Sequence, residues 1–268
     1  MKKFLFAFSF ALFVGVLFFS GCGENKSAMV KLRIGVISGP EEQVAEVAAK
    51  IAREHHNINV ELVAFSDYLM PNAALDDGTL DANAFQHLPF LNQQALARGY
   101  KLAVAGKTFL YPLAGYSKRF KKVADLPDRA RVAVPNDQSN QGRALLLLAG
   151  QGLITLRAGV GANASVLDII DNPKKLRILE LDAAQLPRAL PDVDLAVINT
   201  TFASQIGLTP AVDGLFIEDK NSPYVNLIVT REGRENDPAV RAFVQAYQTE
   251  EVLRAAEKLF PGSVVKGW

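Results

Sequence analysis

The sequence predicts an α/β protein folded into two lobes, and three observations lead to that prediction. The 268 residues allow one large domain or two lobes, since a domain typically has roughly 100–200 residues. Segments with strand and helix patterns alternate along the chain. Long extended segments interrupt this alternation at 107–117 and 224–230. A chain that leaves one lobe, builds a second and returns needs two such crossings, so we expect a hinged cleft that could hold a ligand.

The first part of the chain has the pattern of three strand–helix pairs. In the first pair, 31–37 alternates in hydrophobicity, and 41–55 carries apolar residues at helical spacing. The further strands are expected at 60–65 and 80–85, and the further helices at 67–75 and 89–98. Repeated strand–helix pairs favour a parallel sheet with helices on its faces.

The pattern restarts after the first crossing. Strands are expected at 131–134, 175–179 and 194–198, and helices at 141–150, 186–190 and 201–206. The second crossing leads into C-terminal helices within 238–260. We therefore assign 30–112, completed by 225–268, to lobe 1 and 113–224 to lobe 2.

The N-terminus has the features of a lipoprotein signal peptide over 1–21. Lys2 and Lys3 precede a sixteen-residue apolar run at 4–19, which is shorter than the about 20 residues of a spanning helix. Small residues then lead directly to Cys22, the single cysteine, as in a bacterial lipobox. We expect Cys22 to be diacylated and 22–29 to form a polar tether. The alternative is an ordinary secretory signal in which this cysteine is incidental.

Composition excludes several functions. The chain has 29 basic and 28 acidic residues, and removal of Lys2 and Lys3 with the leader would give a net charge of −1, so no basic surplus supports nucleic-acid binding. A single cysteine excludes an intramolecular disulfide and a cysteine-based zinc site. His55 and His56 are adjacent at a helix end, which favours a solvated terminus over a metal site. No nucleotide-binding or hydrolase motif occurs, so we expect no catalytic residue, metal or cofactor.

Aromatic residues gather just after the third predicted strand. Phe85 and His87 share one face of an extended segment, and Phe90 follows across a proline. Such a stripe belongs either to a hydrophobic core or to the wall of a ligand pocket.

Polar residues with special positions also occur in the predicted helices and strands. Asn140 is the expected N-cap of its helix, which places Arg143 in the first turn, where the helix dipole disfavours a cation. A bound carboxylate would explain that position, and a surface arginine pointing away is the alternative. Asn199 ends a strand of buried type, and Asn226 interrupts an apolar strand, where it needs hydrogen-bond partners.

These segments resemble, in order and over nearly the whole mature chain, the methionine-binding lipoproteins of bacterial ABC importers (the NlpA/MetQ family). The matching strings are FSDYLMPNAAL, DANAFQHLP, YPLAGYS, VAVPNDQSNQGRALLLL, LAVINTTFASQIGL, DKNSPYVNLIVTRE and VKGW. The resemblance implies a two-lobed periplasmic binding protein fold of type II, with mainly parallel sheets and two hinge crossings.

The resemblance also implies a ligand site. The pocket for the ligand side chain would be formed by Tyr68, Phe85, His87 and Phe90, where Phe90 replaces the tyrosine expected in close relatives. Arg143 would hold the α-carboxylate with its donor fork, and Asn199 and Asn226 would bind the amino-acid backbone. This set suits methionine, because a thioether gains about 0.3–1.5 kcal/mol from each good aromatic contact.

The predicted function is that of a membrane-anchored substrate-binding protein and not an enzyme. It would be a monomer in the cell envelope, facing the periplasm or exterior, that binds L-methionine, with D-methionine as a second candidate, and delivers it to an ABC permease with a separate ATPase. The alternatives are a surface interaction lipoprotein with a vestigial pocket, a binder of a related amino acid or Met-containing dipeptide, and a hydrolase on the same scaffold. The hydrolase is disfavoured because no nucleophile–base pair is evident.

Overall fold

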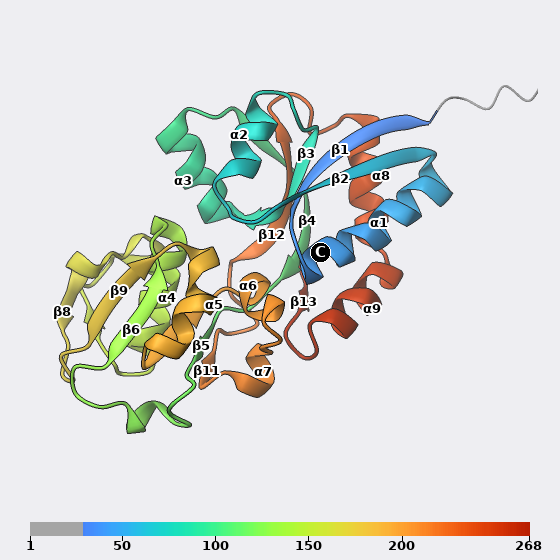
Figure 1. Ribbon diagram of the computed structural model, residues 1–268. Coiled ribbons are helices and arrows are strands. Elements are labelled where there is room, and N and C mark those ends of the chain that lie inside the picture. The colour runs from blue at the N-terminus through green and yellow to red at the C-terminus, as the bar shows by residue number, and fades with distance from the viewer. Residues whose placement is uncertain (1–28) are drawn as a thin grey trace, which may run out of the picture.

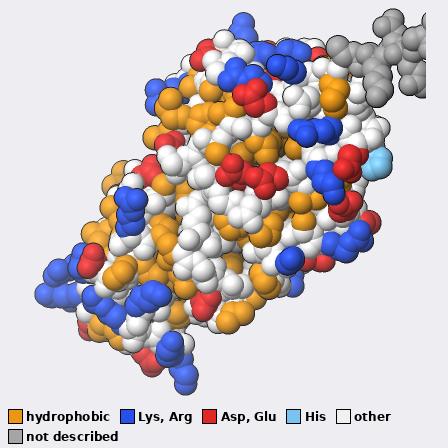
Figure 2. All heavy atoms as spheres, turned by 45° about the vertical axis from the view of Figure 1, so that its right-hand side comes forward, with side chains coloured by type: hydrophobic (Ala, Val, Ile, Leu, Met, Phe, Trp, Pro, Cys, Tyr) orange, Lys and Arg blue, Asp and Glu red, His pale blue; other side chains and the backbone are white. Residues whose placement is uncertain are grey.

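The computed structural model describes residues 29–268 and divides them into two α/β lobes (Figure 1). The predicted signal peptide, Cys22 and the tether up to residue 28 lie outside the described residues. Within residues 29–268, no helix is both long enough and apolar enough to cross a membrane. Acidic and basic side chains are interspersed over the face shown in Figure 2.

The first lobe is built on a six-stranded sheet with the order β13-β4-β12-β3-β1-β2. Its strands are β1 (Val30–Ile37), β2 (Ile58–Phe65), β3 (Ala82–His87), β4 (Leu102–Leu110), β12 (Val225–Arg231) and β13 (Val265–Lys266). β1 runs parallel to β2 and β3, as the strand–helix pairs predict, while β12 is antiparallel to both β3 and β4. We call this part the six-stranded lobe.

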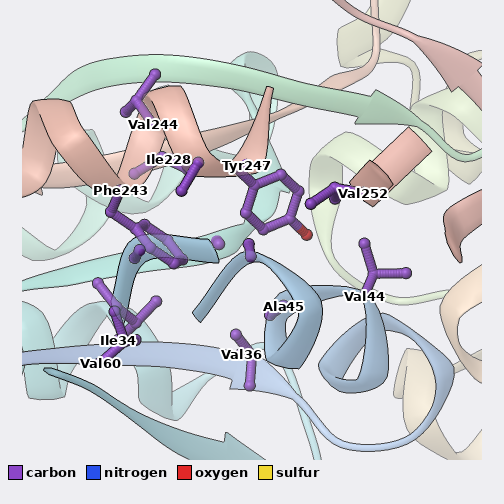
Figure 3. Packing of buried hydrophobic residues seen from close by; sticks show 14 of the residues in the cluster. Ile34, Val36, Val44, Ala45, Val60, Ile228, Phe243, Val244, Tyr247 and Val252 are labelled. Atoms are coloured by element: carbon purple, nitrogen blue, oxygen red, sulfur yellow. The ribbon is translucent and has the colours of Figure 1, made fainter. Parts of the chain in front are cut away.

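Helices cover both faces of this sheet (Figure 1). They are α1 (Pro40–His56), α2 (Met70–Asp76), α3 (Leu88–Arg98), α8 (Pro238–Tyr247) and α9 (Glu250–Leu259). Phe243 and Tyr247 of α8 pack between α1 and the strands, in one cluster with Ile34, Val36 and Ile228 (Figure 3). Burial of this apolar cluster joins the C-terminal helices to the N-terminal half of the sheet.

The second lobe, which we call the five-stranded lobe, has a sheet with the order β11-β5-β10-β6-β9. Its strands are β5 (Ala114–Tyr116), β6 (Arg131–Pro135), β9 (Arg177–Leu181), β10 (Leu195–Ile198) and β11 (Phe216–Ile217), and a separate pair is formed by β7 (Thr155–Leu156) and β8 (Ile169–Asp171). The helices are α4 (Gln138–Gly150), α5 (Leu186–Ala189), α6 (Thr200–Gln205) and α7 (Pro210–Asp213).

The prediction of mainly parallel sheets is wrong, because both sheets are mixed. In the five-stranded lobe β6 is parallel to β9 and β10, but β5 is antiparallel to β10 and β11. The crossings cause this arrangement. The chain leaves the six-stranded lobe along β4 and returns along β12, so these two neighbouring strands run in opposite directions.

The first crossing is not one continuous extended strand, as the segment 107–117 suggested. β4 ends at Leu110, and β5 begins at Ala114 in the other sheet. Pro112 lies between them and has no N–H for a sheet ladder, which favours a break there. The second crossing is 218–224 and not the predicted segment 224–230, since Val225–Arg231 form β12 of the six-stranded lobe. It lies beside the first crossing, because the Leu113 N–H donates to a Glu218 carboxylate oxygen at 3.1 Å and the Glu218 N–H donates to the Leu113 carbonyl at 2.8 Å.

Candidate functional site

A pocket lies between the two lobes, and the space between its side chains, including space open to solvent, is about 330 Å³. Its lining residues are Tyr68, Phe85, Gln86, His87, Phe90, Tyr111, Asn140, Arg143, Asn199, Thr200, Thr201 and Asn226. All seven pocket residues proposed from the sequence are therefore brought together, although Tyr68 and Asn226 are 158 residues apart in the chain.

The strand ends explain why these residues meet. Phe85 and His87 lie at the carboxyl end of β3, and Asn199 directly follows β10. Asn226 stands at the amino end of β12, and because β12 is antiparallel to β3, Asn226 pairs with His87. The carboxyl edges of sheets are the usual place for ligand sites in α/β folds.

Aromatic rings form one wall of the pocket. Tyr68 stacks on Phe85 with ring centroids 5.8 Å apart, and Phe90 meets the Phe85 ring edge-on at 5.9 Å. Phe202 of α6 closes against Tyr68 from the other lobe at 4.7 Å. The wall is thus both part of a hydrophobic cluster and a pocket surface, so the two interpretations of the aromatic stripe are not exclusive.

His87 holds a defined tautomer at the start of α3. Its Nδ1 accepts a hydrogen bond from the Phe90 N–H at 3.2 Å, so the proton lies on Nε2, which donates to Asn140 Oδ1 at 3.3 Å. Burial, followed by the charge of Arg143, lowers the pKa of His87 from 6.5 to about 3. His87 is therefore a neutral donor that links the two lobes at physiological pH.

The prediction that Asn140 is the N-cap of α4 is wrong. Asp137 is the N-cap, and its carboxylate accepts the N–H of Asn140 at 2.9 Å. The helix begins at Gln138, so Arg143 is its sixth residue and lies beyond the first turn. The helix dipole therefore does not account for Arg143, because that effect is confined to the terminal turn.

Arg143 is instead part of a buried ion pair with Glu218. Its Nε donates to Glu218 Oε1 at 2.7 Å, its Nη2 donates to Glu218 Oε2, and Nη2 also donates to the Tyr111 carbonyl at 3.0 Å. The guanidinium carbon lies 4.5 Å from the centroid of the Tyr224 ring. Arg143 thereby joins both crossings, and the alternative of a surface arginine is wrong, since it is 3% exposed.

This pairing changes what Arg143 can offer a ligand. The Nε and Nη2 atoms of Arg143 already donate hydrogen bonds within the protein, while Nη1 has no hydrogen-bond partner among residues 29–268. A ligand carboxylate can thus meet the guanidinium only at Nη1 in this arrangement, and not with the two-nitrogen fork expected from the sequence.

Asn199 presents an amide oxygen without a donor. Its Nδ2 donates to Asn140 Oδ1 at 2.9 Å, and Asn140 Nδ2 in turn donates to Asp137 at 3.0 Å. This chain fixes the orientation of both amides, since a carboxylate can only accept. Asn199 Oδ1 is buried and has no partner within residues 29–268. A buried acceptor of this kind is costly unless a ligand or water supplies a proton.

Asn226 has the hydrogen-bond partner that its position in an apolar strand demands. Its Nδ2 donates to Glu41 Oε1 at 3.0 Å, and the second Glu41 oxygen accepts from Thr201 Oγ1 at 3.0 Å. Burial raises the pKa of the Glu41 carboxyl from 4.5 to about 8, while the bonds from Thr201 and Asn226 act in the opposite direction.

Sequence reasoning missed Glu41 and treated it as the first residue of an amphipathic helix. Gly39 adopts φ of 102°, which glycine tolerates readily, and Pro40 opens α1. This turn directs Glu41 inward, where it is 2% exposed, while the neighbouring Glu42 accepts the Gly39 N–H at 3.3 Å. A signal was present, because Glu41 comes only four residues after the carboxyl end of β1, the kind of strand end that Asn199 directly follows in the other lobe.

Among residues 29–268, no group of three or more His, Cys, Asp or Glu side chains is arranged to hold a metal ion. The polar atoms of the pocket are amides, hydroxyls, one neutral imidazole and one paired guanidinium. This set can bind complementary charges and hydrogen-bonding groups of a small molecule.

Comparison with known proteins agrees with this architecture. The model of the NlpA lipoprotein family matches residues 32–268. The chain belongs to this family. Among curated members, the probable D-methionine-binding lipoprotein MetQ of Vibrio cholerae is 60% identical over 252 residues, covering 94% of each chain. The D-methionine-binding lipoprotein MetQ of Escherichia coli K12 is 57% identical, covering 95% of each chain.

Solved structures of similar binding proteins have the same fold. A crystal structure of the methionine-binding protein MetQ superposes with a TM-score of 0.88 at 59% identity, covering 89% of this chain and 98% of the other. A nutrient-binding protein from Burkholderia cenocepacia, bound to methionine, superposes with a TM-score of 0.87 at 51% identity, covering 88% and 100%. The fold is therefore that of the periplasmic substrate-binding proteins.

Proposed function

We propose that this protein is a substrate-binding lipoprotein that binds methionine between its lobes and delivers it to an ABC permease with a separate ATPase. It acts as a binding protein and not as an enzyme. The observation that carries the proposal is the chemistry of the pocket, where an aromatic wall lies beside separate polar groups for an acid and an amine. The methionine named for the relatives is the ligand that such a pocket fits.

Each part of methionine has a counterpart in the site. The thioether side chain would lie against Tyr68, Phe85 and Phe90, since sulfur makes favourable contacts with aromatic rings. Arg143 Nη1 would bind the α-carboxylate. The amide oxygens of Asn199 and Asn226 would accept from the ammonium group, and His87 would help to hold the lobes together around the ligand.

Closure of the lobes would couple binding to delivery. We propose that 113–224 moves as one unit against 30–112 with 225–268, about the two crossings. Methionine contacts both units, so it favours the closed arrangement by the difference between its affinities for the closed and open states. The closed surface is then the one offered to the permease by a monomeric binding protein.

Titration calorimetry with purified protein tests the ligand assignment. We expect L-methionine to bind, and D-methionine, methionine sulfoxide and glycyl-methionine to establish the range of ligands. Methionine amide should bind poorly, because it lacks the carboxylate that meets Arg143. Absence of both binding heat and a thermal shift with every methionine derivative would leave the proposal without support, and a different amino acid retained through purification would change the ligand.

We further propose that Cys22 anchors the protein in the cell envelope, facing the periplasm or exterior. Two or more acyl chains give stable membrane anchoring, whereas a single chain is marginal. Cys22→Ala should therefore release the protein into the soluble fraction without weakening methionine binding, as measured by fractionation and calorimetry. Retention of the variant in membranes at high salt would contradict the lipid anchor.

A further inference from the structure

Glu41 is a buried carboxyl group for which the protein supplies no cation. It is 2% exposed, and no Lys or Arg side chain within residues 29–268 forms an ion pair with it. Its two oxygens accept only from neutral donors, Asn226 Nδ2 and Thr201 Oγ1, each at 3.0 Å. Because a buried acid without a counter-charge is costly, its retention at this place needs a reason.

The first consequence of Glu41 concerns the orientation of Asn226. When it is ionised, as it would be beside an ammonium group, the Glu41 carboxylate can only accept hydrogen bonds, so it requires the NH₂ group of this amide to face it. The Asn226 Oδ1 atom is left for other donors, and Asn226 lines the pocket. Glu41 thereby determines that the pocket meets an acceptor at this point and not a donor. An amide oxygen with a negative charge behind it attracts an ammonium group.

The second consequence concerns the lobes. Glu41 lies at the start of α1 in the six-stranded lobe, whereas Thr201 belongs to α6 in the five-stranded lobe. Their hydrogen bond therefore crosses between lobes. A second hydrogen bond between the lobes lies nearby. Gln205 Nε2, at the end of α6, donates to the carbonyl of Ser38, two residues before α1, at 2.8 Å. The hydrogen bond between Glu41 and Thr201 is thus made only when the lobes approach each other.

We infer that Glu41 is a positioning residue for the α-amino group of the ligand: it orients Asn226, supplies the opposing charge, and through Thr201 ties recognition of the amine to lobe closure. This inference rests on the proposed binding of methionine. It makes the amine, and not only the carboxylate and thioether, a requirement of the site.

Of Glu41 and the three tyrosines near it, Glu41 is the group whose protonation state changes near neutral pH. Burial is the main reason why the pKa values of Tyr68, Tyr111 and Tyr247 are raised, and the charge of Glu41 raises them further. These phenols therefore stay neutral. The carboxyl of Glu41 itself has a pKa of about 8, so it is mostly protonated at pH 7 in the absence of a cation. An ammonium group beside Asn226 would favour its ionised form, and methionine binding would then release a proton.

The experiment compares methionine with 4-(methylthio)butanoate, which lacks only the α-amino group, by calorimetry on the full-length protein. Glu41→Gln keeps the size and one acceptor but removes the charge. We expect it to weaken methionine binding about tenfold or more and to change binding of the analogue by less than about twofold. Glu42→Gln is the matched control, since Glu42 is the next acid of the same turn but does not contact Asn226; it should bind both ligands as the wild type does.

A second measurement needs no analogue. Titrations at pH 7 in two buffers with different ionisation enthalpies should show that methionine binding releases about one proton in the wild type and in Glu42→Gln, and none in Glu41→Gln. Equal weakening of both ligands by Glu41→Gln, unchanged methionine affinity in that variant, or undiminished release of a proton by Glu41→Gln would overturn the role of Glu41. Failure of the wild type to bind methionine at all would instead overturn the proposed function.

Discussion

Two buried charged residues at the pocket, Arg143 and Glu41, differ in whether the protein supplies an opposite charge for them. At one end Arg143 is neutralised by Glu218 within the protein, and the pair is further held by the Tyr111 carbonyl and the Tyr224 ring. At the other end Glu41 has only neutral donors, and burial raises its pKa to about 8. One charge is already balanced in the absence of ligand, and the other is not.

This difference separates stability from recognition. The paired guanidinium of Arg143 is fixed in place before the ligand arrives, and only its Nη1 atom remains to donate to the ligand. An unpaired carboxyl is held protonated until a cation approaches, so its electrostatic contribution is realised only on binding. We therefore expect mutations at Arg143 to weaken both folding and affinity, and mutations at Glu41 or Asn199 to weaken affinity with no large loss of stability.

Arg143→Ala should have the largest effect and would break the comparison most directly. Because Glu218 would remain buried without its partner, the free energy of unfolding should fall by about 3–5 kcal/mol in urea denaturation. Loss of the ligand carboxylate contact costs about 2–5 kcal/mol, so methionine affinity should fall by roughly 30-fold to several thousand-fold in calorimetry.

A double variant separates these two effects. Arg143→Met with Glu218→Gln removes both charges, so most of the stability should return while methionine binding stays weak. Wild-type stability in the single variant Arg143→Ala would show that the Glu218 pair does not matter for folding.

The pH dependence of ligand-free stability should show the second largest effect. For Glu41 the folded state keeps a proton that the unfolded chain loses above about pH 4.5, so the Glu41 contribution to stability falls as pH rises from about 4.5 to about 8. For His87 the unfolded chain binds a proton below about pH 6.5 that the folded state does not bind until about 3, so the His87 contribution falls as pH is lowered from about 6.5 to about 3. The two contributions oppose each other between about pH 4.5 and 6.5, so the net loss of stability is expected above and below that range. Each limb amounts to something on the order of a few kcal/mol.

Urea denaturation between pH 3 and 9 measures both limbs, and two variants assign them. Glu41→Gln should remove the alkaline limb and be more stable than the wild type at pH 8, whereas His87→Gln should reduce the acid limb. A wild-type profile that is flat from pH 5 to 9 would contradict the unpaired state of Glu41.

Asn199→Ala sharpens the comparison at the amine end. Removing a buried oxygen that has no donor relieves a cost in the free protein, which offsets loss of the bond to Asn140. We expect a change in melting temperature of only a few degrees and a fall in methionine affinity of about tenfold or more. A large loss of stability with unchanged affinity would show that Asn199 only supports Asn140.

Tyr224→Leu should have the smallest effect. It removes the ring that faces the Arg143 guanidinium, a contact worth about 0.5–2 kcal/mol. Tyr224→Phe keeps the aromatic face and is the control, so it should resemble the wild type in urea denaturation. Equal losses in both variants would assign the effect to the phenolic hydroxyl.

Six of the seven pocket residues stood out in the sequence through a local signal, whereas Tyr68 could be named only from the family resemblance. Phe85 and His87 alternate on one strand face, and Asn226 is a polar residue in an apolar strand. The errors arose where a local rule has two solutions. Asp137 and Asn140 are both good helix caps, and choosing between them shifted Arg143 by a whole turn. Glu41 and Glu42 are both favourable at a helix start, and only the turn at Gly39 directs one inward and the other toward the backbone.

The sequence by itself determined the alternation of strands and helices, the two crossings and the family, since these depend on periodicity and on residues close together in the chain. Only the tertiary structure decided the direction of the strands in each sheet and the partner of each buried charge. Arg143 lies 75 residues from Glu218, and Glu41 lies 185 residues from Asn226. Such pairs form because burial removes water from both groups, so each must bind whichever partner the packed lobes bring within reach.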